Sequence, residues 1–164
     1  MVDRATRTHG ATSDVCRCLV RDDRSQSHPF ECGGCLSLPS YEVADLFEWS
    51  PTATYDAVFF SFWLSHVPED RFAPFWLKVA AALRPGGRAY LIDSPPDETS
   101  TAHDHRMPDP DGIQERRLND GRTFRIVKLF REPADLSSSL QALGWRTAFE
   151  RTPNYFVYGQ ATPL

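Results

Sequence analysis

Two apolar runs separated by a helical pattern constrain the fold more than any other feature of this sequence. Residues 55–64, YDAVFFSFWL, form a continuous apolar and aromatic run that is typical of a strand buried on both faces of a sheet. Residues 88–93, RAYLID, form a second run of this kind. The sequence therefore predicts a βαβ unit, with parallel strands and a right-handed crossover.

The helix of this unit is predicted to begin near residue 68. Pro68 suits a first helical turn, and Glu69 and Asp70 suit the positive end of the helix dipole. Apolar residues then recur at helical spacing, at Phe72, Phe75, Trp76, Val79 and Leu83. Pro74 lies early enough to kink the helix rather than abolish it, and RPGG at residues 84–87 is expected to end it.

The remainder of the chain predicts a loop, a hairpin, a helix and two strands. Residues 94–113 have no apolar period and predict a long loop after a strand's carboxyl end. Residues 116–130 predict a β-hairpin that turns at Asn119-Asp120-Gly121. Its arginines and lysine could attract an anionic substrate or could simply be solvated edge charges. Residues 132–145 predict a helix, and residues 146–159 predict two short strands.

Residues 1–40 have a different character. They show no period of 2 or 3.6 and few aliphatic residues, so they predict an irregular segment. The four cysteines of the chain all lie here, at Cys16, Cys18, Cys32 and Cys35. Two close pairs of thiolates could surround a zinc ion, although a C-x-C pair is unusual in structural zinc sites; free thiols are the alternative.

Composition excludes several classes of function. The chain has 164 residues, 41% of them apolar, and a formal net charge of -4, so it has no overall basicity that would favour nucleic acid. No segment reaches the roughly 20 apolar residues of a membrane span, and residues 1–14 lack the apolar core of a secretory signal. We therefore expect a cytoplasmic protein of the α/β class that binds neither nucleic acid nor membranes.

From residue 41 onward, the order of elements resembles the second half of a class I S-adenosylmethionine-dependent methyltransferase. The most recognisable stretch is ALRPGGRAYLID, residues 82–93, which looks like the family's fifth strand and the end of the helix before it. The final helix and strands resemble the family's antiparallel sixth and seventh strands. The resemblance implies an incomplete Rossmann-like sheet, strands three to seven of the family pattern, with the hairpin as an insertion.

The resemblance also implies contacts with S-adenosylmethionine as the cofactor. Asp45 and Leu46 match the position after the third strand that contacts the adenine amino group and ring, where a carboxylate can accept a proton and an aliphatic side chain can pack. Ser61, Phe62 and Trp63 match the motif after the fourth strand, which lines the methionine end of the cofactor.

His66 and Asp93 are the candidate catalytic residues, and no metal ligand is expected. His66 could act as a general base near the transferred methyl group, because an unperturbed pKa of about 6.5 allows both protonation states at neutral pH. Alternatively, it is a structural histidine at the start of a helix. Asp93 ends the second predicted strand, where open α/β sheets bind ligands, so it could face the substrate or cap the loop that begins at Ser94.

One element of the family is missing. A strand and a glycine loop should precede the adenine site by roughly fifty residues, and CGGC at residues 32–35 does not replace them. Without that first strand, residues 55–63 would lie at the sheet edge and could pair with a second copy or a partner chain. Three explanations of the missing element are open. Residues 1–40 are mistranslated and the gene encodes the complete domain, or the chain is a partial domain that a partner completes, or it is a small binding module with a cysteine zinc site.

The sequence thus predicts two parts: an irregular segment over 1–40, disordered or mistranslated, and a partial methyltransferase domain over 41–164. The expected activity is methyl transfer from S-adenosylmethionine to a small-molecule acceptor, retained or lost in this truncated chain. The alternative is a non-catalytic accessory or binding module. In-line alignment of donor and acceptor is expected to supply most of any rate enhancement.

Overall fold

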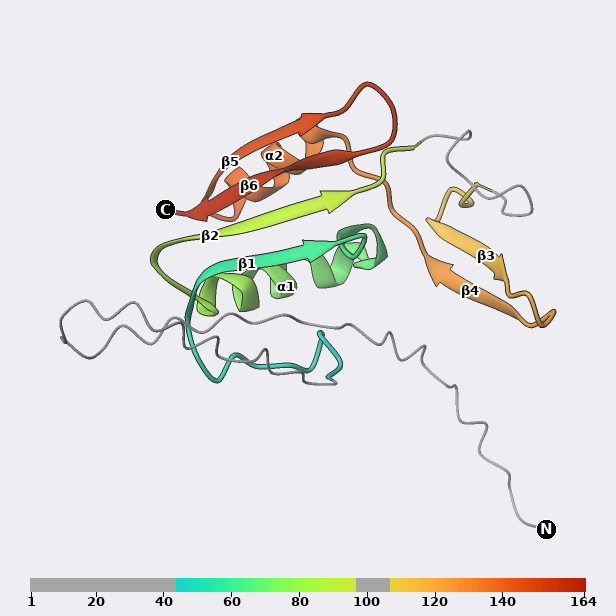
Figure 1. Ribbon diagram of the computed structural model, residues 1–164, viewed down its shortest axis with the longest axis horizontal. Coiled ribbons are helices and arrows are strands. Elements are labelled where there is room, and N and C mark those ends of the chain that lie inside the picture. The colour runs from blue at the N-terminus through green and yellow to red at the C-terminus, as the bar shows by residue number, and fades with distance from the viewer. Residues whose placement is uncertain (1–43, 97–106) are drawn as a thin grey trace, which may run out of the picture. The chain divides into compact units, whose positions relative to one another are not determined.

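The computed structural model describes residues 44–96 and 107–164 (Figure 1). It divides the chain into two units, Met1–Ser50 and Pro51–Leu164, which are described separately. The predicted irregular segment, its cysteines, the strand expected before Asp45 and the middle of the predicted long loop lie outside the described residues. Within the described residues, no cluster of histidine, cysteine and carboxylate side chains could hold a metal ion, and no helix is long and apolar enough to cross a membrane.

The predicted βαβ unit is confirmed. It consists of β1 (Tyr55–Ser61), α1 (Glu69–Ala81) and β2 (Leu83–Asp93), and β1 and β2 are parallel. Pro68 precedes the first turn of α1, and the helix continues through Pro74 as expected. The apolar stripe supplies the buried face of the helix, at Phe72, Phe75, Trp76 and Val79.

Strand β2 begins earlier than the sequence predicts. The expected strand covers residues 88–93, whereas β2 starts at Leu83. Tyr55 lies opposite Leu83 but Ala57 lies opposite Arg88, so the intervening RPGG residues form an irregularity in β2. Proline and glycine are tolerated at such a bulge because a bulged residue needs no ladder hydrogen bond.

The basic hairpin is also confirmed. Strands β3 (Ile113–Arg117) and β4 (Thr123–Val127) are antiparallel and form their own two-stranded sheet. The turn between them is closed by the backbone N–H of Gly121, which donates to the carbonyl oxygen of Leu118 at 2.9 Å. In Figure 1 the hairpin stands beside the arrowheads of β1 and β2, that is, at the carboxyl edge of the main sheet.

The last three elements complete the main sheet. They are α2 (Pro133–Ala142), β5 (Trp145–Arg151) and β6 (Val157–Pro163). Gly144, with φ of +80°, ends the α2 segment as the sequence predicts, because a left-handed residue there terminates a helix. The strand order is β1-β2-β6-β5, and β6 is antiparallel to both of its neighbours. The predicted antiparallel closing strands are therefore confirmed.

Helices α1 and α2 cover the same face of this sheet. Trp76 of α1 meets Trp145 of β5 edge to face, with ring centroids 4.9 Å apart. Leu136 and Leu140 of α2 are fully buried, and Leu136 lines a cavity together with Leu91 of β2. The core of the 51–164 unit thus lies between one layer of helices and one face of the sheet (Figure 1).

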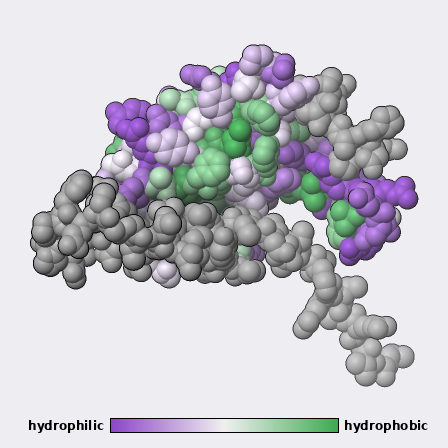
Figure 2. Space-filling view, viewed as in Figure 1, coloured by the Kyte–Doolittle hydropathy of each residue, from purple (hydrophilic) through white to green (hydrophobic). Residues whose placement is uncertain are grey.

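The prediction that β1 is buried on both faces is wrong. No residue of β1 is buried; Phe60 packs on α1, but Phe59, which points to the other face, is 65% exposed. Among the described residues, β1 pairs with β2 alone. Figure 2 shows hydrophobic surface at the centre of this other face of the sheet. The expected edge position of this apolar strand is therefore confirmed.

Candidate functional site

The carboxyl ends of β1 and β2 lie at one edge of the sheet because the two strands are parallel. A short 3-10 helix, η1 (Leu64–His66), follows β1 at this edge. Open α/β sheets bind ligands at the carboxyl ends of their strands. Three of the predicted cofactor residues stand here: Ser61 ends β1 and is exposed, Phe62 is 47% exposed, and Trp63 is buried.

Phe62 has a left-handed backbone, with φ of +52°. This conformation is strained for a bulky side chain, and such strain concentrates at functional sites. The backbone N–H of Phe62 donates to the carbonyl oxygen of Ile92 at 2.8 Å, and its ring meets the ring of Phe156 at a centroid distance of 6.1 Å. These contacts hold the turn that redirects the chain from β1 into η1.

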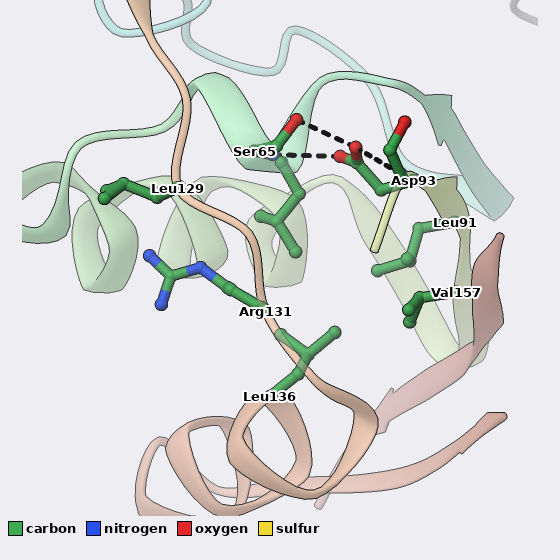
Figure 3. Close-up of a pocket in the computed structure, with 9 residues that line it drawn as sticks. Ser65, Leu91, Asp93, Leu129, Arg131, Leu136 and Val157 are labelled. Carbon is green, nitrogen blue, oxygen red and sulfur yellow. Dashed lines mark hydrogen bonds between the residues drawn. The ribbon is translucent and has the colours of Figure 1, made fainter. Parts of the chain in front are cut away.

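Ser65 and Asp93 form a buried clamp between η1 and the end of β2 (Figure 3). The backbone N–H of Ser65 donates to Oδ2 of Asp93 at 2.9 Å, and Oγ of Ser65 donates to Oδ1 at 2.8 Å. The backbone N–H of Ser94 also donates to Oδ1, at 2.8 Å. These three donors satisfy the carboxylate in the way that a buried charge requires. The contact with Ser94 is that of a loop cap; the substrate contact of Asp93 stays a prediction.

Lys128 joins the clamp from the hairpin. Its Nζ donates to Oγ of Ser65 at 2.7 Å and lies 3.8 Å from Oδ1 of Asp93. The lysine is only 7% exposed, and burial lowers its pKa while the Asp93 carboxylate raises it. The Ser65 hydroxyl therefore accepts a hydrogen bond from the lysine and donates one to the carboxylate. This chain of contacts fixes the hairpin to the carboxyl edge of the sheet.

His66 is held by the same hairpin. Its Nδ1 lies 2.7 Å from the carbonyl oxygen of Val127. A carbonyl oxygen only accepts hydrogen bonds, so Nδ1 must carry the proton and Nε2 the lone pair. Burial is the largest influence on the pKa of His66 and lowers it; Lys128 lowers it further, while the Val127 hydrogen bond and Asp93 raise it. The imidazole is therefore held neutral at neutral pH, with one nitrogen able to accept a proton.

A small cavity lies beside the clamp, lined by Ser65, Asp93 and apolar side chains from η1, β2, α2 and β6 (Figure 3). Its volume of about 10 Å³ has room for about one water molecule. Nε of Arg131 is buried and has no hydrogen-bond partner among the described residues, while Nη2 donates to Glu69 at 2.8 Å. The cavity thus suits a bound water and is too small for a larger ligand.

Asp45 and Leu46 belong to the other unit and are described apart from this edge. Oδ1 of Asp45 accepts a hydrogen bond from the backbone N–H of Phe47 at 2.8 Å, and its carbonyl oxygen accepts from Glu48 and Trp49. Asp45 therefore caps a turn. Leu46 is buried. Their contact with adenine stays a prediction.

The structure thus brings together five predicted site residues at one edge: Ser61, Phe62, Trp63, His66 and Asp93. It also adds two that sequence analysis missed, Ser65 and Lys128. Lys128 carried a signal, because it is the one charged residue in the apolar run IVKLF, residues 126–130. Ser65 carried none, since a serine before a helix is common.

No family model and no curated protein sequence matches the chain. Among solved structures, the DhpI–SAH complex is 40% identical, with a TM-score of 0.63, over 76% of this chain and 54% of the DhpI chain. A DhpI–SAM–HEP complex matches at 40% identity, with a TM-score of 0.65, over 74% and 56%.

A second solved protein shares the fold at low identity. The glycopeptide N-methyltransferase MtfA, complexed with S-adenosyl-L-methionine, is 17% identical, with a TM-score of 0.53, over 74% of this chain and 63% of its own. At that identity, the match shows the fold alone. The chain spans little more than half the length of DhpI. By fold and by sequence identity, the chain resembles part of a class I S-adenosylmethionine-dependent methyltransferase, the family that the sequence predicts.

Proposed function

We propose that this chain contributes to methyl transfer from S-adenosylmethionine to a small-molecule acceptor. The observation that carries the proposal is the 40% identity to DhpI over 76% of the chain, because DhpI has been solved with SAM and HEP bound. The edge formed by β1, η1 and β2 supports it, since ligand-binding residues of open α/β sheets occupy that position.

Ser61, Phe62 and Trp63 are the residues proposed to hold the cofactor. Ser61 is exposed, so its hydroxyl can bind a polar group of a ligand. The half-exposed ring of Phe62 offers an apolar surface beside it. These residue types fit a ligand with polar and apolar parts. When bound, S-adenosylmethionine supplies a methyl group, whose bond to the sulfonium sulfur breaks as the bond to the acceptor forms.

His66 is the proposed general base. Its Nδ1 is committed to the Val127 carbonyl oxygen, so Nε2 is the nitrogen that would take a proton from a hydroxyl or ammonium acceptor. Its lowered pKa keeps this nitrogen unprotonated at neutral pH. Asp93 contributes indirectly, since its carboxylate holds η1, which carries His66. We also propose that Asp93 contacts the substrate.

Isothermal titration calorimetry on the full chain tests cofactor binding. We expect S-adenosylmethionine and S-adenosylhomocysteine to bind, and Phe62→Ala to weaken binding about tenfold, which corresponds to about 1.4 kcal/mol. Phe124→Ala is a matched control, because Phe124 is a similarly exposed phenylalanine on the hairpin. If neither ligand binds the wild-type chain, then this chain alone does not carry the cofactor site.

Methyl transfer is tested with labelled S-adenosylmethionine and with HEP, the other component of the DhpI–SAM–HEP complex, as the first acceptor. We expect His66→Gln to lower kcat about 100-fold if the acceptor must lose a proton. An unchanged kcat would remove His66 from the base role. The experiment requires the wild-type chain to bind cofactor first.

A second candidate function is that of a non-catalytic binding module that pairs through residues 55–63. The observation that favours it is the exposed apolar edge strand, with Phe59 at 65% exposure. Analytical ultracentrifugation tests self-association. Phe59→Lys is expected to shift a wild-type dimer to monomer, and Phe124→Lys to leave it unchanged. A wild-type chain that stays monomeric at all concentrations would contradict self-association through this strand.

A further inference from the structure

Lys128 is a buried cation that the proposed methyl transfer does not use. It immediately follows β4, 63 residues after Ser65 in the sequence, and it is 7% exposed. Burying an ammonium ion costs several kcal/mol unless it is paired and hydrogen-bonded. A charge at a solvated strand edge would not incur this desolvation cost. The position of Lys128 therefore calls for a role at the carboxyl edge of the sheet.

The contacts of Lys128 converge on the short helix that carries His66. The ammonium ion donates to Oγ of Ser65, which is in η1 next to His66. The carbonyl oxygen of the preceding residue, Val127, accepts a hydrogen bond from Nδ1 of His66. The following residue, Leu129, donates its backbone N–H to the carbonyl oxygen of Ser65 at 2.7 Å. Three consecutive residues at the end of the hairpin, Val127 to Leu129, therefore hold two consecutive residues of η1.

We propose that Lys128 is a positioning residue for His66: by binding Ser65 and Asp93, it seats the end of β4 against η1, so that the Val127 carbonyl fixes the imidazole with its proton on Nδ1 and its lone pair on Nε2. The inference rests on the proposed function only in taking His66 as the base. In this proposal, the role of the hairpin is to set the tautomer of His66.

The charges around His66 agree with this arrangement. Lys128 and Arg116 from the hairpin both lower the pKa of His66, and Asp93 from β2 raises it. The Nδ1–H of His66 is donated to the Val127 carbonyl oxygen, and Asp93 raises the pKa of His66 through its charge. The Val127 hydrogen bond and the positive charges of the hairpin therefore both favour an unprotonated Nε2.

The test is a nitrogen-15 NMR titration of the imidazoles in the full chain, with no cofactor present. His66 is assigned among the five histidines by comparison with His66→Gln. In the wild-type chain, we expect the neutral imidazole of His66 to be the Nδ1–H tautomer. In Lys128→Met, which keeps the length of the side chain but removes the charge, we expect the pKa of His66 to rise and the Nδ1–H tautomer to lose population.

Arg146→Met is the matched control. It removes one positive charge from the exposed start of β5, opposite Thr162, whereas the Asp93 end of β2 faces the other end of β6. We expect this variant to leave the His66 titration unchanged. If Lys128→Met does not fold, Ser65→Ala removes the bridging hydroxyl and is also expected to reduce the Nδ1–H tautomer.

Two results would overturn the proposal: a wild-type His66 with its proton on Nε2, or a tautomer and pKa that do not change in Lys128→Met or, where that variant is unfolded, in Ser65→Ala. Neither result depends on methyl transfer. Conversely, a chain that binds no cofactor but shows the expected tautomer and its loss would contradict the proposed function and leave the positioning role of Lys128 intact.

Discussion

Two variants break the buried Lys128–Asp93 pair, and Asp93→Asn is expected to lower the free energy of unfolding much more than Lys128→Met. In Asp93→Asn, the ammonium ion remains buried and loses its countercharge, and Ser65 Oγ is its one hydrogen-bond acceptor among the contacts described. In Lys128→Met, the carboxylate keeps three donors, from the backbone and hydroxyl of Ser65 and the backbone of Ser94. The two single variants therefore report two different penalties.

The structure sets the size of these effects. Two unit charges 3.8 Å apart attract by about 4 kcal/mol at an effective dielectric constant of about 20, before desolvation is subtracted. Removing one partner of a buried pair typically costs about 3–5 kcal/mol, which is our expectation for Asp93→Asn. A hydrogen-bonded charge that stays satisfied loses less, so we expect about 1–3 kcal/mol for Lys128→Met. The coupling free energy between the two sites should be about 1–3 kcal/mol.

Urea denaturation of the two single variants and the double variant measures this coupling as a double-mutant cycle, provided that the m-values agree. The control cycle uses Arg84→Met and Asp56→Asn. That pair is closer, at 2.9 Å, but its side chains are 37% and 65% exposed, so we expect less than about 1 kcal/mol. A coupling below about 0.5 kcal/mol for the buried pair, or no larger than the control, would refute the argument from burial.

Three further predictions concern packing, pH and backbone approach. Trp76→Ala should lower the free energy of unfolding by about 3–5 kcal/mol, because Trp76 is fully buried among aromatic rings, whereas Leu77→Ala on the same helix should cost less than about 1 kcal/mol at 65% exposure; thermal unfolding compares them. Since the pKa of His66 is lowered from 6.5 on folding, the unfolded chain binds the proton more readily, and stability should fall as pH decreases through 6.5 toward the folded pKa. His66→Gln should flatten that part of a pH series of urea midpoints, and a parallel curve would contradict the assignment. Gly159→Ala should lower the free energy of unfolding by more than about 2 kcal/mol, because a Cβ there would overlap the backbone of β5. An unchanged melting temperature would contradict this prediction, since it would show that β5 and β6 can move apart without loss of stability.

Local patterns predicted most of the elements because their causes are local. The stripe from Phe72 to Val79 defines the buried face of α1, and the turn at Asn119-Asp120-Gly121 defines the hairpin. The sequence predicted that RPGG separates the helix from the strand, and this was wrong because RPGG forms an irregularity within β2. That irregularity depends on pairing with β1, which the local sequence does not reveal. The expected burial of β1 failed for a related reason. An apolar run shows that a strand can be buried, but the second covering layer must come from elsewhere.

The candidate site divides in the same way. Ser61 ends β1, and Phe62 and His66 come within five residues of it, so their place at the carboxyl edge could be predicted from chain order. The clamp of Ser65 with Asp93 and Lys128 could not, because its members are 28 and 63 residues from Ser65 and nothing local brings them together.

The sequence by itself determined the order of strands and helices, the parallel βαβ unit and the resemblance to a methyltransferase, since each depends on periodicity, turn residues and spacing along the chain. Only the tertiary structure decided that no residue of β1 is buried, that both helices share one face of the sheet, and that Lys128 reaches Ser65. Burial, charge pairing and the tautomer of His66 depend on residues that are close in space, and only folding brings those residues together.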